Sequence, residues 1–153
     1  MKRTLIICVA AVLVIGGLGL VAFWPGAEPG VRADPEDTAQ VATGATLYQA
    51  KCASCHGADL EGQPDWQSPL ASGGYPAPPH DETGHTWHHP DGLLFEITKH
   101  GGQAVAPANF QSNMPAFAAE MADDEIWAVL AFIKSQWPAD VRARQDAISR
   151  QAQ

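Results

Sequence analysis

Basic side chains are scarce in this sequence. Its 153 residues include 9 Lys and Arg against 17 Asp and Glu. Lys2 and Arg3 precede every acidic residue, so the part from Ala27 onward carries 7 basic and 17 acidic side chains, a net charge of −10. A surface of this sign argues against nucleic-acid binding and favours partners that carry basic patches.

Internal repeats and cysteines are also few. No repeat with a period of about 20–50 residues occurs, which argues against a repeat architecture. Of the three cysteines, Cys8 lies in an N-terminal apolar run, whereas Cys52 and Cys55 lie close together and are followed by His56. Strand and helix patterns do not alternate, as a thioredoxin-like fold would require, and no second Cys pair completes a structural zinc site. A disulfide between Cys52 and Cys55 stays open as an interpretation.

Residues 5–24 form a run of 20 residues without a charged side chain. At helical rise such a run spans about 30 Å, the thickness of the hydrocarbon core of a bilayer. Lys2 and Arg3 before the run and the acidic chain after it predict a cytoplasmic N-terminus with the rest outside. We therefore predict that residues 1–27 are a single-pass anchor in a bacterial cytoplasmic membrane, with the remaining chain on the periplasmic side.

Two alternatives to an anchor remain. A cleaved signal sequence has a shorter apolar core and a small-x-small cleavage site, for which Ala22 and Ala27 are poor candidates. A lipoprotein would be modified at Cys8, but Ile7 precedes it where a small residue is expected. All three interpretations carry the remainder of the chain out of the cytoplasm.

The run Cys52-Ala53-Ser54-Cys55-His56 has the spacing of covalent c-type haem attachment. Two thiols one helical turn apart can add to the two vinyl groups at one edge of a porphyrin, and the adjacent imidazole can then reach the iron. Met114 is the candidate for the opposite axial position, because a thioether opposite an imidazole raises the haem potential in electron carriers. The alternative interpretation of Met114 is a core methionine in a loop.

Helical patterns lie on both sides of this motif. Asp34-Pro35 predicts a helix start, a cap residue followed by proline at the first helical position, and apolar spacing carries that helix to Cys52. Residues 91–100 predict a short helix. A last helix is predicted over residues 123–136, without a capping side chain at Ala122. Its expected buried face consists of Ile126, Val129, Leu130 and Ile133.

This combination resembles a class I cytochrome c. In that family a glycine and an aromatic residue on the first helix pack against the last helix where the two cross, and Gly44 and Tyr48 match those positions. Val129 and Phe132 are the contacts that the resemblance implies on the last helix. The resemblance covers about residues 40–137, and its most specific part is the order of the haem motif and the methionine.

The resemblance implies a mostly α protein, with three to five helices around one covalently bound haem c. Cys52 and Cys55 would hold the haem, and His56 and Met114 would ligate its iron, leaving neither axial position open. The implied function is the transfer of single electrons between membrane or periplasmic redox proteins, such as a dehydrogenase donor and an oxidase acceptor, rather than catalysis. A haem enzyme or gas sensor is the alternative, and it requires an open or labile iron site.

The expected organisation follows the chain in four parts. Residues 1–27 are the anchor or signal sequence, 28–39 a linker and the start of the first helix, 40–137 the cytochrome domain, and 138–153 a polar tail. We expect this tail to be a short amphipathic or frayed helix that carries no functional residue.

A proline-rich stretch precedes Met114. The carbonyl of one of its prolines should accept a hydrogen bond from Nδ1–H of His56, fixing the tautomer of that ring, and Pro69 is the candidate. Four side chains are candidate donors to a haem propionate: Trp66, Tyr75, Trp87 and Asn109.

Histidines concentrate at His85, His88 and His89, with His80 and His100 nearby. The favoured interpretation is a polar loop that faces solvent. The alternative is a second metal site for copper or zinc, because imidazole ligates both. That alternative would make the protein a periplasmic copper-binding protein with an auxiliary haem. A third possibility is that one of these histidines displaces Met114 from the iron, which would lower the potential.

Overall fold

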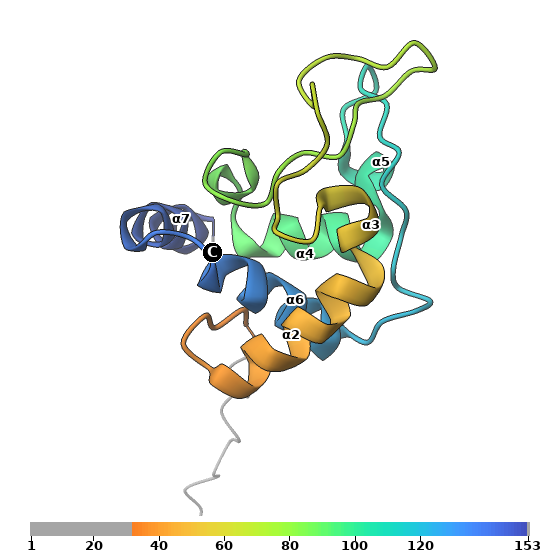
Figure 1. Cartoon of the computed structure of the whole chain (residues 1–153). Coiled ribbons are helices and arrows are strands. Elements are labelled where there is room, and N and C mark those ends of the chain that lie inside the picture. Colours follow the sequence, from red (N-terminus) through yellow and green to blue (C-terminus); the bar gives the residue numbers. More distant parts are fainter. Residues whose placement is uncertain (1–31, 153) are drawn as a thin grey trace, which may run out of the picture. The chain divides into compact units, whose positions relative to one another are not determined.

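The computed structural model describes residues 32–152, which contain helices and loops and no strand (Figure 1). In chain order the elements are α2 (Thr38–Lys51), α3 (Ala53–His56), the 3-10 turn η1 (Thr86–His88), α4 (Asp91–His100), α5 (Gly102–Val105), α6 (Asp123–Ser135) and α7 (Ala139–Gln151). Long loops at 57–85 and 106–122 connect them. The prediction of a mostly α fold is confirmed for this part of the chain.

The predicted membrane span, residues 5–24, lies outside the described residues, as does Cys8. Among the helices of residues 32–152, none has the length and apolar character needed to cross a membrane.

The first helix begins later than predicted. Asp37, and not Asp34, is its N-cap: the Asp37 carboxylate accepts hydrogen bonds from the backbone N–H groups of Ala39 (3.0 Å) and Gln40 (3.1 Å). Asp34 and Pro35 belong instead to a turn, closed by a 3.2 Å hydrogen bond from Asp37 N–H to the Asp34 carbonyl. The later position prevails because one carboxylate there satisfies two N–H groups that the helix leaves without partners.

α2 and α6 cross in the most extensive contact between helices of the described residues (Figure 1). α6 begins at Asp123 as predicted. Ala122 has no capping side chain, but the Glu125 carboxylate accepts a hydrogen bond from Ala122 N–H (2.8 Å), which supplies half of a capping box. The predicted apolar face is confirmed, because its four residues are all buried: Ile126, Val129, Leu130 and Ile133.

Gly44 permits the close approach of α2 to α6. A Cβ atom at this position would overlap the backbone carbonyl of Ala128 and would lie 3.0 Å from Cβ of Phe132. Tyr48, one turn later, is fully buried, and the centroid of its ring lies 5.3 Å from that of Phe132. The predicted packing of Gly44 and Tyr48 against the last helix is thereby confirmed, with Ala128 as an additional contact.

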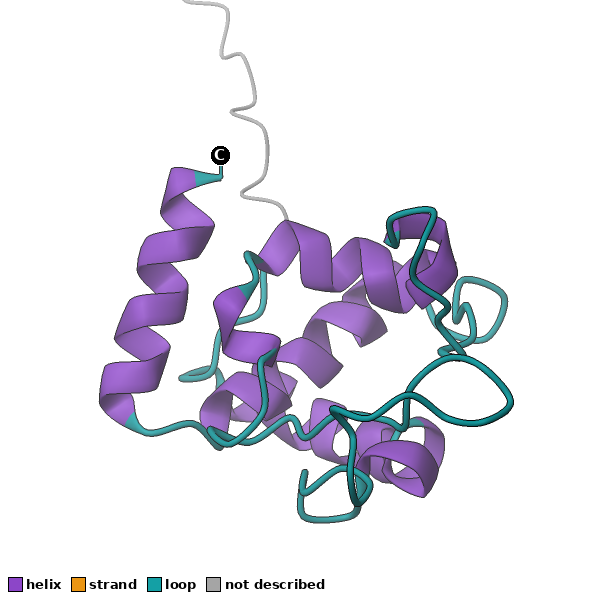
Figure 2. Cartoon of the chain, turned by 90° about the horizontal axis from the view of Figure 1, so that it is seen from above, coloured by secondary structure: helices purple, strands orange, loops and turns teal. Residues whose placement is uncertain are grey.

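Of the two forms expected for the C-terminal tail, an amphipathic helix and a frayed one, the structure shows an ordered helix. The C-terminal residues form α7, a helix of 13 residues that packs on η1 and runs along one side of the bundle in Figure 2. Val141, Gln145 and Ser149 point inward and are buried. Two of these three side chains are polar, so the buried face of α7 has no apolar periodicity from which it could have been predicted.

Candidate functional site

The two thiols and His56 follow one another around the C-terminal end of α2. Cys52 ends this helix, and the single turn of α3 carries Cys55 and His56, whose N–H bonds to the Cys52 carbonyl at 2.9 Å. Both cysteines are free thiols, Cys52 half-buried and Cys55 exposed. Burial raises the pKa of Cys52 to about 11, so its thiol is protonated at neutral pH. One helical turn therefore presents two unpaired thiols and an imidazole in the order that haem attachment requires.

The ring of His56 is buried and held by the backbone of a proline-rich loop. Its Nδ1–H donates a hydrogen bond to the Pro78 carbonyl at 2.8 Å. Burial lowers the pKa of His56, and the Pro78 bond opposes this effect in part. With the proton on Nδ1, the lone pair of Nε2 is available for a metal. This tautomer and the two free thiols fit a covalently bound haem.

Pro78 replaces Pro69, the acceptor that was expected from the sequence. Pro69 is exposed in the outer part of the same loop. The chain reverses direction after His56, with hydrogen bonds from Gly62 N–H to the His56 carbonyl (2.8 Å) and from Gln63 N–H to the Ala77 carbonyl (2.9 Å). These bonds place the residue after Ala77, and not Pro69, beside the imidazole.

His80 is a site residue that the sequence did not single out. Its ring stacks on that of His56, with centroids 4.0 Å apart and an angle of 22° between the planes. Burial is the main cause that lowers the pKa of His80 well below the ordinary value, and the neighbouring His56 and His85 add to it. His80 thus lies against a face of the His56 ring.

Met114 lies in a loop that is tied to α4 and α5. Its N–H donates to Ser112 Oγ (3.3 Å), and its carbonyl accepts a hydrogen bond from Gly102 N–H (3.2 Å). Two residues of the same loop donate hydrogen bonds to the end of α4: Phe117 N–H to the Thr98 carbonyl (3.2 Å) and Ala118 N–H to the Lys99 carbonyl (3.0 Å). The Met114 side chain is half-buried and packs against the core, as Cys52 does. The loop thus holds the thioether at the core and not in solvent.

The four candidate propionate donors differ in the hydrogen bonds and ring contacts that they already make within the protein. Trp87 Nε1–H donates to the Glu82 carbonyl at 3.3 Å. Trp66 stacks on His85, with ring centroids 5.4 Å apart. Tyr75 is stacked on Phe110 and 38% exposed, and Asn109 is exposed. Trp87 is therefore the weakest of the four candidates.

The three clustered histidines do not converge on one point. His85 stacks on Trp66, and His88 stacks on Trp87 with ring centroids 3.6 Å apart. His89 meets His85 edge to face at 5.4 Å. Within the described part of the chain, no three His, Cys, Asp or Glu side chains are grouped so that they could hold a metal ion. The alternative of a second metal site at His85, His88 and His89 is therefore not supported.

Comparison with known proteins gives one match. The family model described as Cytochrome c matches residues 41–137. No curated protein and no solved structure matches the chain. The matched residues run from the first turn of α2 to the second residue after α6, so they include the haem motif and the Met114 loop but not α7.

Proposed function

This chain belongs to the cytochrome c family, and on that premise we propose that it is a mono-haem electron carrier with Cys52, Cys55, His56 and Met114 as its haem-binding residues. The observation that carries the proposal is the hydrogen bond from Nδ1 of His56 to the Pro78 carbonyl. It leaves Nε2 of a buried imidazole free to ligate a metal, on the same helical turn as two free thiols. A plain disulfide or a solvent-facing histidine would not need this arrangement.

The haem c that this family binds covalently supplies one-electron exchange between ferric and ferrous iron. The chain fixes the imidazole with the Pro78 carbonyl and offers the Met114 thioether from a loop bonded to α4 and α5. Two such ligands from the chain would leave no axial position for a small-molecule substrate. This ligation supports electron transfer over catalysis.

The haem domain is proposed to work outside the cytoplasm, tethered to the membrane by residues 1–27. Covalent haem attachment and the charge asymmetry around residues 5–24 support this location. A tether would raise the effective concentration of the carrier near membrane-bound donors and acceptors.

Replacing Met114 by histidine tests the proposed ligation. The weak near-infrared sulfur-to-iron band of the oxidised holoprotein should disappear, and the reduction potential should fall, because an imidazole replaces the thioether. Met121→Leu is the matched control: Met121 is 5% exposed in the core and should affect neither property. The measurements are optical spectroscopy and redox titration of protein matured with c-type haem assembly.

Two results would contradict this ligation. One is a near-infrared band that survives Met114→His. The other is carbon monoxide binding to the ferrous wild-type protein, which would reveal an open or labile iron site and favour a haem enzyme or gas sensor.

An uncharged face adjoins the Met114 loop. Residues 66–80 and 101–119 contain no Asp, Glu, Lys or Arg. The rings of Tyr75 and Phe110 stack across these two loops, with centroids 5.2 Å apart and planes 4° apart. Large apolar side chains are exposed on both loops: Leu70 (41%), Tyr75 (38%), Val105 (39%) and Phe110 (41%). Figure 1 shows the two loops side by side, beyond α3 and α5.

Redox partners are proposed to approach in two stages. The net charge of −10 attracts proteins with basic patches over long range. Contact is then made over the uncharged face, where few charges must lose their hydration. On this proposal the acidic surface determines how the rate of electron transfer depends on ionic strength, and Tyr75 and Phe110 supply the energy of contact.

Tyr75→Ser and Phe110→Ser should each lower the rate of electron transfer about tenfold at every ionic strength, equivalent to about 1.4 kcal/mol of contact energy. Glu120→Gln, a change at an exposed carboxylate, should alter only the dependence on salt. The measurement is the oxidation rate of the reduced protein by membranes of the source organism. Rates that rise with salt would contradict the attraction of basic partners, and an unchanged rate in both Ser variants would contradict the contact face.

A further inference from the structure

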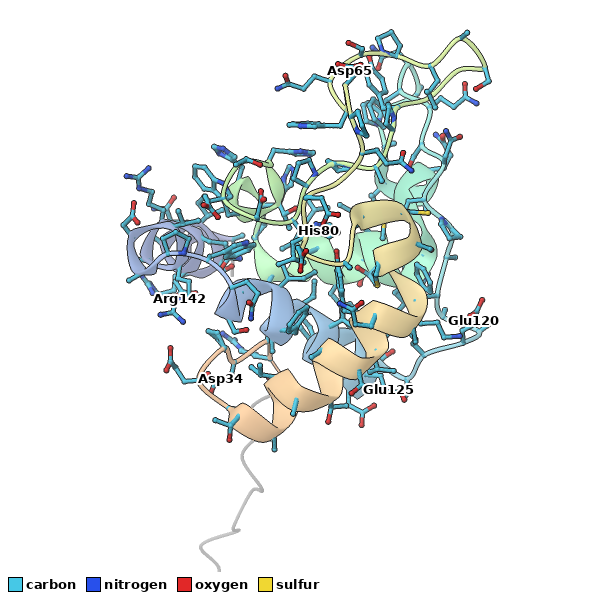
Figure 3. The ribbon with its side chains drawn as sticks, in the orientation of Figure 1. Asp34, Asp65, His80, Glu120, Glu125 and Arg142 are labelled. Carbon is cyan, nitrogen blue, oxygen red and sulfur yellow. The ribbon has the colours of Figure 1, made fainter. Side chains whose placement is uncertain are left out.

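The imidazole of His56 is constrained on a face as well as at its edge. The Pro78 carbonyl binds the edge, through Nδ1. The ring of His80 covers a face at a centroid distance of 4.0 Å. Tyr48 in turn meets His80 edge to face at 6.2 Å, so the pair continues into the contact between α2 and α6. Figure 3 shows His80 in the interior of the domain, among α3, α4 and α6.

His80 is itself fixed by hydrogen bonds from three directions. Its N–H donates to the Leu60 carbonyl (2.8 Å), and its carbonyl accepts from Trp137 Nε1–H (2.7 Å). Its ring Nδ1 lies 2.8 Å from Thr86 Oγ1, whose own proton is directed to the Pro79 carbonyl (3.4 Å). Both contacts are hydrogen bonds only when the hydroxyl accepts from a proton on Nδ1 of His80. Two of these bonds fix the backbone of His80, and the contact with Thr86 fixes its ring.

We propose that His80 is a positioning residue for the axial imidazole: its stacked ring, held by Thr86 and carried by a backbone that Trp137 anchors, fixes the rotation of the His56 ring. The hydrogen bond to Pro78 alone leaves the ring free to tilt about the line from Nδ1 to the carbonyl. A second ring parallel to the first removes that freedom. The inference rests on the proposed function, because it presumes that His56 ligates the haem iron.

The consequence for electron transfer follows from geometry. Outer partners of a metal-bound histidine set the orientation of its ring, and their loss costs about 10–100-fold in affinity or activity. If the imidazole keeps one orientation in both oxidation states, less of the site must rearrange when an electron arrives. Loss of the stacked ring should therefore slow electron exchange without removing a ligand.

His80→Leu and His80→Phe form the matched pair that tests this role. Phenylalanine keeps a flat ring against His56, whereas leucine fills the space without one. The readout is the pattern of haem methyl resonances in the NMR spectrum of the oxidised holoprotein, which reports the plane of the axial imidazole. His80→Leu should change this pattern and slow electron self-exchange about tenfold, and His80→Phe should preserve the pattern.

Val141→Ala in α7 is the control for lost stability, because it removes buried apolar volume without touching either histidine. It should lower stability and leave the pattern unchanged. The proposal is overturned if the pattern is the same in His80→Leu as in the wild type, or if His80→Phe changes it as much as His80→Leu does.

Thr86→Val keeps the test decisive if His80→Leu does not fold. Valine has nearly the shape of threonine but cannot form a hydrogen bond with Nδ1 of His80. The His80 ring should then be held less firmly, and the pattern of haem methyl resonances should change. An unchanged pattern in Thr86→Val would then overturn the proposal. A wild-type protein without attached haem or without His56 ligation would instead contradict the proposed function, and its own spectrum would show this before any variant is made.

Discussion

Gly44→Val should largely prevent accumulation of folded holoprotein, and Gly44→Ala should lower its free energy of unfolding by about 3 kcal/mol, the upper end of typical overpacking costs. A Cβ at this position would overlap the Ala128 carbonyl, which belongs to the backbone of α6 and cannot rotate away. The helices would have to separate, and Tyr48 and Phe132 would lose their contact. The measurement is chemical denaturation of the haem-loaded protein, followed by circular dichroism.

Gly92→Ala is the same substitution in a different environment. Gly92 lies in α4, and no atom would come within 4 Å of an added Cβ. Alanine loses less backbone entropy than glycine in a helix, so this variant should be more stable by about 0.5–1 kcal/mol. If the free energy of unfolding falls in Gly44→Ala and rises in Gly92→Ala, the close helix crossing is the cause of the loss at Gly44. A similar, small effect at both positions would show that α2 and α6 tolerate a wider separation.

The second large effect is expected at Asp91. Its carboxylate binds Lys134 Nζ with both oxygens, at 2.9 and 3.1 Å, and also accepts a hydrogen bond from Gln145 Nε2 at 2.6 Å. The side chain of Lys134 is only 3% exposed, and its other carboxylate, Asp146 at 3.3 Å, is 44% exposed. Asp91 therefore neutralises a buried ammonium and joins α4, α6 and α7.

Asp91→Asn should lower the free energy of unfolding by about 3–5 kcal/mol, because it leaves the charge of Lys134 buried with a single exposed partner. Backbone amides of α7 should also exchange with solvent faster. Denaturation and hydrogen exchange measure these two effects. In the double variant with Lys134→Met the buried charge is gone, so most of the lost stability should return.

Glu120→Gln is the control for an ordinary ion pair. Glu120 binds Lys51 at 2.7 Å, but both side chains are at least one-third exposed, so its loss should cost at most about 1 kcal/mol. An Asp91→Asn variant no less stable than Glu120→Gln would show that solvent reaches Lys134 and that the network does not hold α7.

Features that depend on neighbours in the chain were predictable. The haem motif lies within one helical turn, and α4 and α6 have acidic residues in the first turn, basic residues in the last turn and the apolar spacing of a helix. The pairing of Gly44 and Tyr48 with the last helix was also predictable, because the resemblance to class I cytochromes c supplied the partner. The start of α2 was wrong by a few residues, since several acidic residues there could each act as the cap.

Contacts between distant segments were not predictable in the same way. The choice of Pro78 over Pro69 depends on how the loop after His56 closes, and the stacking of His80 depends on the same closure together with Trp137, which lies 57 residues away. α7 was taken for a tail because its partners, Asp91 and His89, lie more than 50 residues earlier in the chain.

Local sequence was thus sufficient for the motif, the main helices and the family. The tertiary structure alone settled which loop atoms meet the imidazole, that His85 and His88 stack on two different tryptophans, and that a polar helix belongs to the core. The physical reason is the range of the interactions. Helix caps and periodicity act over a few residues, whereas a hydrogen bond between loops becomes favourable only after the whole chain has brought its two ends together.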